Sequence, residues 1–459
     1  MNDPEEIAQS LRKTAAQLLD ALPKNAQNEI AGQYESKMRI IFEGNDYSVA
    51  AETADRVIGI RTIENGRMGF LSTNEGNGQL SESAAEATAL ARLAPPSEFH
   101  SIAPASAGIT APTSKHRHLD PELLAMDPEN AIKHLAILIE AATSDPRISI
   151  DRAEIGIQFS LNCVMNSNGL VSEWGISTID WFAMGMAREG DQVTSFDYDG
   201  GALRKLAEAR DALNKTGNDF RNALLQSLNP GRGESYKGPV LLHPRATSEL
   251  FQSAILTNCN ARMHQDKTSS WAGKMGHPVA HAGINAFEDP TDVDRPEGWN
   301  AFDREGVSTC RHDLIQSGHL KFLAHNCFTA KKAGVAPTGN AMGSARSIPG
   351  IGFQNPSFEA GPEIQRIADE MLLNAIPKAL LLVRFSGNDD PVSGEFSGVA
   401  KNSFWLENGT LRPAGEVMIS GNLFEMLKNP LAASRAHQIF GGSTAPYVLV
   451  DGLSVTVGS

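Results

Sequence analysis

One short segment divides this chain into two stretches of different texture. Residues 229–233 read Asn-Pro-Gly-Arg-Gly, a run of turn-forming residues. Before this run, stretches of helical periodicity alternate with paired strand-like stretches, whereas after it glycine-rich turns recur about every ten residues. The chain has 459 residues, more than the roughly 250–300 at which a single hydrophobic core stops growing. We therefore predict two domains, residues 1–234 and 235–459.

The first domain is predicted to pack helices on a mixed or antiparallel sheet. Asp3 and Pro4, followed by apolar residues three and four apart, predict a helix over residues 3–22. The Asn65-Gly66 dipeptide predicts a hairpin turn. The remaining expectations are strands at 37–42, 57–62, 68–72, 148–164 and 170–187, and helices from about residue 81, from residue 127 and over about 203–228. Residues 95–114 are rich in Pro, Ala and Ser and predict an exposed connector.

The second domain is predicted to be mainly antiparallel β. Only two of its stretches have convincing helical periodicity, at roughly 247–258 and 362–375. The fold class expected for the whole chain is therefore α+β.

The charge balance bears on partners and location. Forty basic residues against fifty-four acidic ones give a net charge of −14, and we see no basic cluster that would form a phosphate-binding stripe. The sequence shows neither a secretory signal nor an apolar run of ~18 residues. These features predict a cytoplasmic protein that binds neither nucleic acid nor a membrane.

Four cysteines are scattered without the C-x-x-C spacing of a metal or redox site. They are Cys163, Cys259, Cys310 and Cys327. We interpret them as buried free thiols in a reducing compartment.

A zinc hydrolase motif of the H-E-x-x-H type is absent from the sequence. None of the twelve histidines is followed by Glu, although such a motif needs that Glu as general base. His243 precedes a predicted helix that contains Glu249 but no second His, and His277 and His281 lie four apart in a stretch broken by Pro278 and Gly283. Serine-nucleophile and nucleotide-binding glycine motifs are absent too. We therefore expect no metal site and no cofactor in this chain.

Several phrases of the sequence, in order, resemble one family. They are SNGL at 167–170, SSWAGKMG at 269–276, EDP at 288–290, FDREGVST at 302–309, GHLK at 318–321, TAKK at 329–332, TGNA at 338–341, VSGEFSG at 392–398, WLENG at 405–409 and ISGNL at 419–423. Over about residues 150–455 the chain is similar to the TldD/PmbA family, also called modulators of DNA gyrase, and more to its PmbA/TldE branch than to its TldD branch.

This resemblance implies a PmbA/TldD-like fold and a protease assembled from a TldD-type and a PmbA-type chain. Such proteases cleave unfolded or precursor peptides. In TldD-type chains the strand corresponding to residues 239–242 leads into H-E-x-x-x-H, and a Cys near the C-terminus completes the zinc site. This sequence departs from that pattern at His243, and no Cys follows Cys327. The expected role is a non-catalytic subunit, dimeric with a TldD-like partner that carries zinc, or with itself.

Five residues are candidates for substrate contact. Asp303, Arg304 and Glu305 belong to one family phrase, and Glu395 and Ser397 belong to another. The structural alternative for the first three is an ion pair at Arg304 beside a turn at Gly306. For the other two it is an ordinary hairpin loop with side chains that cap backbone groups.

Two other functions stay open at this point. One is that the chain is itself a metallopeptidase with a nonstandard site built from His243, His277 or His281. Alternatively, it is a regulator of a nucleic-acid enzyme that acts through protein contacts, which its acidic charge permits.

Overall fold

The computed structural model describes residues 3–44, 46–74, 79–108 and 117–458. Within the first half the elements are α1 (Pro4–Ala21), β1 (Gln27–Glu43), β2 (Asp46–Glu64), β3 (Arg67–Thr73), α2 (Leu80–Leu93), β4 (Arg117–His118), α3 (Pro121–Leu124), α4 (Pro128–Ala142), β5 (Ile148–Asn166), β6 (Val171–Glu189), β7 (Gln192–Val193), β8 (Asp197–Leu203) and α5 (Ala209–Gln226).

The second half contains shorter strands and several short helices. They are β9 (Tyr236–Leu242), α6 (Pro244–Asn258), α7 (Ala261–Gln265), β10 (Ile284–Glu288), β11 (His312–Gln316), β12 (His319–Leu320), α8 (Cys327–Ala333), β13 (Ala341–Met342), β14 (Gly350–Ile351), β15 (Pro356–Ala360), β16 (Gln365–Ile367), α9 (Asp369–Ala375), β17 (Lys378–Leu382), β18 (Arg384–Asp389), β19 (Glu395–Lys401), β20 (Phe404–Glu407), β21 (Thr410–Pro413), β22 (Val417–Asn422), α10 (Leu423–Lys428), β23 (Pro430–Ser434), β24 (Gln438–Phe440), β25 (Ser443–Ala445) and β26 (Val448–Val457).

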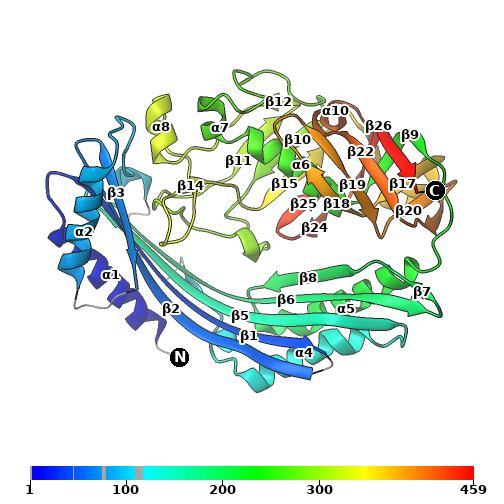
Figure 1. Cartoon of the computed structure of the whole chain (residues 1–459), viewed down its shortest axis with the longest axis horizontal. Coiled ribbons are helices and arrows are strands. Elements are labelled where there is room, and N and C mark those ends of the chain that lie inside the picture. The colour runs from blue at the N-terminus through cyan, green and yellow to red at the C-terminus, as the bar shows by residue number, and fades with distance from the viewer. Residues whose placement is uncertain (1–2, 45, 75–78, 109–116, 459) are drawn as a thin grey trace.

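The first half forms one long, curved sheet in the order β3-β2-β1-β5-β6, with β8 and β4 on the far side of β6. The predicted helix at the N-terminus is present, and the Asp3 carboxylate caps it by accepting a hydrogen bond from the Glu5 N–H. The Asn65-Gly66 turn joins β2 to β3, with both residues at positive φ. Figure 1 shows the sheet curving beneath the second half of the chain, with α1 and α4 on the side away from it.

The central strands of this sheet are buried on both faces. Side chains alternate along a strand, so Ile30 packs in the helix-covered core while its neighbour Ala31 packs against the second half. Ile58 and Val57 divide in the same way. β5 and β6 lie within two residues of their predicted bounds. β1 and β2 extend well beyond the predicted 37–42 and 57–62, because polar residues interrupt the apolar alternation on which the prediction depended.

The second half is built on a ten-stranded sheet, with a six-stranded sheet beside it. Eight strands of the larger sheet follow the order β18-β19-β22-β26-β9-β17-β20-β21, and outside this order β23 pairs with β26 and β16 pairs with β23. Most of its pairings are antiparallel, as predicted, although β9 and β17 run parallel. Trp271 and Trp405 are buried in its core. The α+β fold class expected from the sequence is confirmed.

Four sequence expectations need correction. The helix predicted over 362–375 begins only at Asp369, because residues 365–367 pair with β23 as a strand. The short helices α7, α8 and α10 were not foreseen, and Cys310 is exposed whereas the other three thiols are buried. Within the described part of the connector, Ile102 and Ala103 are buried at the junction of the two halves; residues 109–114 of that prediction lie outside the described residues.

Among the described residues, no helix is both long and apolar enough to cross a membrane.

Candidate functional site

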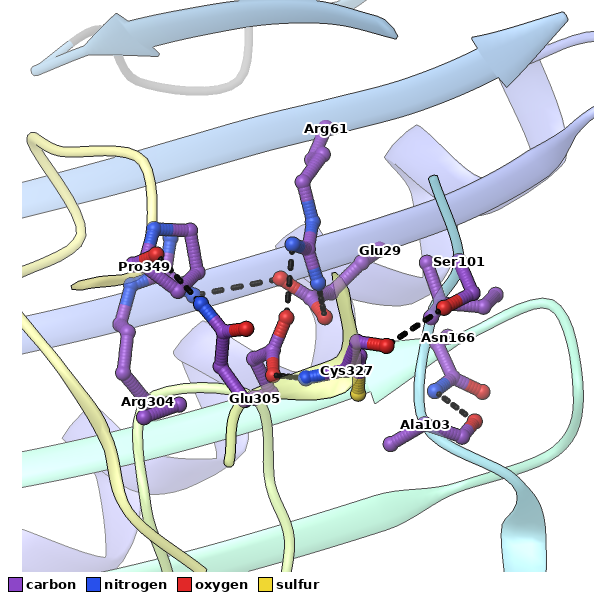
Figure 2. Close-up of polar contacts among 12 residues, drawn as sticks. Glu29, Arg61, Ser101, Ala103, Asn166, Arg304, Glu305, Cys327 and Pro349 are labelled. Carbon is purple, nitrogen blue, oxygen red and sulfur yellow. Dashed lines mark hydrogen bonds and ion pairs between the residues drawn. The ribbon is translucent and has the colours of Figure 1, made fainter. Parts of the chain in front are cut away.

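A buried cluster of charges joins the two halves of the molecule. Arg61 of β2 lies between two carboxylates: its Nη2 is 2.5 Å from Oε2 of Glu29, and its Nη1 is 2.7 Å from Oε1 of Glu305. Glu29 also pairs with Arg304, at 3.3 Å. Figure 2 shows Arg61 and Glu29 reaching from β2 and β1 toward Glu305 of the second half. Two arginines and two glutamates therefore neutralise one another at the junction.

Asp303 fixes the turn that brings Arg304 and Glu305 to this cluster. Its carboxylate accepts hydrogen bonds from the backbone N–H groups of Glu305 (2.8 Å), Val307 (3.0 Å) and Ala341 (2.9 Å). Burial and the neighbouring Glu305 carboxylate raise the pKa of Asp303 to about 8, while the three N–H donors act in the opposite direction. The predicted site residues Asp303, Arg304 and Glu305 are thus together, buried, and engaged with the protein itself.

Cys327, at the start of α8, connects the same cluster to the chain segment before β4. Its backbone N–H donates to Oε2 of Glu305 at 2.6 Å, and its carbonyl accepts from the Ser101 hydroxyl at 3.0 Å (Figure 2). Burial, together with the Glu305 carboxylate, raises the pKa of the Cys327 thiol well above its usual range. Cys327 is therefore a packed thiol at the junction and no activated nucleophile.

A cavity of about 680 Å³ lies elsewhere between the halves, where β8 faces the start of α6 and the β24–β25 hairpin. Its lining includes His243 and Arg245 from the second half and Asp197, Tyr198 and Asp199 from β8. Burial raises the pKa of Asp199 to about 6. The cavity is in the size range of ligand sites, and it opens at the strand-to-helix turn where the resemblance places the zinc motif of TldD-type chains.

Arg245 lies in the first turn of α6 and lines the cavity. Its guanidinium carbon is 4.1 Å from the centre of the Tyr198 ring and 4.6 Å from that of Phe440. Its Nη1 is 3.5 Å from Asp197, and its Nε is 3.4 Å from Glu249. The side chain is only 4% exposed, and its Nη2 has no hydrogen-bond partner among the described residues. A permanent positive charge is therefore fixed here between two rings and two carboxylates.

His243 serves as the N-cap of α6. Its Nδ1 accepts a hydrogen bond from the Arg245 N–H at 3.2 Å, and its ring meets Tyr447 edge to face at 5.0 Å. Burial and the nearby Arg245 charge lower the pKa of His243 to about 4. At neutral pH the imidazole is uncharged, with one nitrogen committed to the helix cap.

The other two histidines singled out from the sequence lie apart from this cavity's lining. His281 Nδ1 accepts from the N–H of Gly283 at 3.0 Å, so it too fixes a turn. Across the described ranges, no group of three or more His, Cys, Asp or Glu is arranged to hold a metal ion.

Glu395 and Ser397 lie on the exposed face of β19. Glu395 accepts a hydrogen bond from the Asn422 side chain at 2.9 Å, and Ser397 stands between Asn388 and Ser420 in the sheet. They belong to a different sheet from Glu29 and Arg61, so the five candidate residues occupy two separate places. Their contact with a peptide stays a prediction.

Sequence reasoning missed Glu29, Arg61 and Arg245 as members of these clusters. Only Arg245 had a local signal, since it follows the Pro that starts α6.

The C-terminal half matches a known family model. Residues 235–457 match the PmbA/TldA metallopeptidase C-terminal domain. A Metalloprotease PmbA homolog from Haemophilus influenzae is 25% identical over 447 residues, which cover 93% of this chain and 91% of that protein. Metalloprotease PmbA from Escherichia coli O157:H7 is 24% identical over 68% of this chain and 69% of its own length.

Solved structures show the same fold. TldE from Thermococcus kodakarensis superposes with a TM-score of 0.84 at 20% identity, covering 98% of this chain and 100% of that one. A protein from Thermotoga maritima described as a candidate modulator of a DNA gyrase gives 0.85 at 20% identity, covering 97% and 100%. The fold and the matched domain define a protein of the metallopeptidase-related class. Residues 235–457 carry the C-terminal domain of the PmbA/TldD family, and the resemblance to that family stated from the sequence is confirmed.

Proposed function

We propose that this chain is the non-catalytic, substrate-guiding subunit of a TldD/PmbA-type protease that processes unfolded or precursor peptides. In this proposal a TldD-like chain supplies the zinc and the general base. This chain pairs with it and supplies part of the wall around the peptide.

The observation that carries the proposal is the buried guanidinium of Arg245 at the first turn of α6. Two positive charges about 4 Å apart repel by several kcal/mol in a poorly solvated site. A zinc ion bound at this turn would meet that repulsion, and His243 already uses one ring nitrogen as the helix cap. Moreover, α6 contains no histidine, so the turn offers no ligand pair of the family's kind.

Within the same proposal the five candidate residues divide into two roles. Glu395 and Ser397, on the exposed face of β19, are the candidates for direct peptide contact. Asp303, Arg304 and Glu305 would act indirectly, by holding the two halves in one arrangement.

The test compares three preparations: this chain alone, a TldD-like partner alone, and the two purified together. Peptide cleavage and bound zinc are measured in each. We expect cleavage and zinc in the mixture and neither in this chain alone. Cleavage by this chain alone that requires zinc and stops with a chelator would contradict the proposal and favour a self-sufficient metallopeptidase.

A second comparison tests the guiding role within the mixture. The double change Glu395→Ala and Ser397→Ala is expected to raise KM for peptide cleavage while the two chains still purify together. Glu129→Ala, on the outer helix α4 with a side chain 81% exposed, is the matched control and should leave KM unchanged. Equal KM values for both variants would remove Glu395 and Ser397 from the peptide path.

A further inference from the structure

A second cavity, of about 390 Å³, lies at the other end of the junction. One side is formed by β2, β3 and the segment before β4, and the other by α7, α8 and β14; Figure 1 shows α8 and β14 standing opposite β3 and α2. Both halves of the chain therefore contribute to it, and it shares no lining residue with the cavity at α6.

Every ionisable side chain in the lining of this cavity is basic. They are Arg61, His100 and Arg262, in a chain with fifty-four acidic and forty basic residues. The charge of Arg61 is offset by Glu29 and Glu305, with which it forms ion pairs in the junction cluster (Figure 2). The lining thus offers hydrogen-bond donors and no carboxylate, which favours a ligand with an anionic group.

Arg262 is the side chain best placed to bind that group. It lies in the first turn of α7, is 53% exposed, and uses its Nε to pair with Asp266 at 2.5 Å. Its guanidinium carbon is 5.4 Å from the centre of the Phe328 ring, which holds the fork in place. Its two terminal nitrogens have no hydrogen-bond partner in the described part of the chain, and such a fork matches the two oxygens of a carboxylate.

The uncharged lining combines the polar residues Ser101, Asn260, Asn326 and Thr329 with several large apolar side chains. Met68, Phe328, Ile348 and Ile351 contribute to it, and Ile348 is 52% exposed although it is a large aliphatic side chain. An exposed aliphatic side chain beside a cation indicates a ligand that joins an apolar body to an anionic end.

We propose that this cavity binds the carboxy-terminal residue of a peptide that ends in a large apolar side chain. The terminal carboxylate lies on the Arg262 fork, and the apolar side chain packs against Phe328 and Ile348. The choice of a peptide rests on the proposed function; the requirement for an apolar carboxylate rests on the cavity alone.

The test is a binding titration of the full chain with acetyl-Ala-Leu-Phe as the free acid and as the carboxamide. Because hydrogen bonds to a charged group are the strong ones, we expect the acid to bind about tenfold or more tightly than the amide. Arg262→Gln should remove this preference. The matched control is Arg311→Gln, since Arg311 is also half exposed, stacks on Phe287 and pairs with Asp313.

Ile348→Ser tests the apolar wall, and Val335→Ser is its control because both side chains are 52% exposed. We expect only the first change to weaken binding of the free acid, by about tenfold. Equal binding of acid and amide, an unchanged preference in Arg262→Gln, or no binding at about 1 mM would overturn the proposal. Octanoate binding as tightly as the peptide acid would overturn the choice of a peptide. These titrations need no partner and no cleavage, so their failure is distinct from failure of the subunit proposal.

Discussion

Two buried arginines at the contact between the halves have opposite surroundings. Arg61 has a carboxylate on each side, at 2.5 and 2.7 Å, and those carboxylates are themselves fully buried. Arg245 is held by two aromatic rings and by longer ion pairs, at 3.4 and 3.5 Å, and it borders an open cavity. The ion pairs of Arg61 lie in a tightly packed contact between the halves, whereas Arg245 lies beside a cavity. The Arg61 cluster therefore joins the two halves, whereas Arg245 places a fixed positive charge on the wall of the cavity.

The largest effect should come from removing the charge at the closed contact. Arg61→Met leaves Glu29 and Glu305 buried near each other with reduced compensation, and we expect the free energy of unfolding to fall by about 3–5 kcal/mol. Arg39→Met is the control, because Arg39 also contacts two carboxylates, Glu154 and Asp180, but its side chain is 45% exposed. That change should cost at most about 1 kcal/mol. Denaturant unfolding measures both, and similar losses would show that the two sites do not differ.

A second effect should appear at the open cavity as a dependence on pH. His243 has a pKa of about 4 in the folded chain, below the ~6.5 of an unfolded chain. Between these values the unfolded state binds more protons at His243, so the contribution of this residue to stability falls as pH drops from about 6.5 to about 4. The contribution of His243 over this window is about 3 kcal/mol. His243→Asn keeps a helix cap and should flatten the slope in unfolding measured across this range; an unchanged slope would contradict the assignment.

A smaller effect on stability is expected from added methyl groups on the two faces of the first sheet, one facing the second half and the other covered by helices. A Cβ added at Gly59 would lie 2.2 Å from the carbonyl oxygen of Ala345, whereas at Gly32 its nearest neighbour would be a Leu11 methyl at 3.3 Å. Gly59→Ala should therefore force the halves apart locally and cost about 1–3 kcal/mol. Gly32→Ala should cost less, because a methyl group can shift. Thermal unfolding compares the stabilities of the two variants. A larger loss of stability for Gly32→Ala than for Gly59→Ala would contradict this prediction.

The sequence predicted the fold class and the local signals well, because these depend on neighbouring residues. The Asp3 cap and the Asn65-Gly66 turn are examples. The extents of β1 and β2 were underestimated, because residues 27–36 and 46–56 contain polar and charged residues that interrupt the apolar alternation. The pairing of Glu29 with Arg61 follows from register, as the two residues stand directly opposite each other.

The clusters themselves were beyond reach because their members come from distant parts of the chain. Glu305 meets Arg61, and Arg245 meets Tyr198, only after the two halves pack together. The family phrase containing Asp303, Arg304 and Glu305 was noticed from sequence, yet nothing local showed that these side chains face inward. Hydrophobic periodicity predicts helices and strands, but it does not predict which charged residues form ion pairs between distant parts of the chain.

The position of the last strand has a consequence for the order of folding during synthesis. β9 opens the second half, but one of its two neighbours in the sheet is β26, roughly two hundred residues later. All strands of the first sheet lie within residues 27–203, so that sheet is complete while the ribosome is still making the rest. β9 must wait with an unpaired edge, which is the kind of surface that chaperones protect. In a nascent chain arrested near residue 440, β1 and β5 should therefore be more resistant to proteolysis than β9.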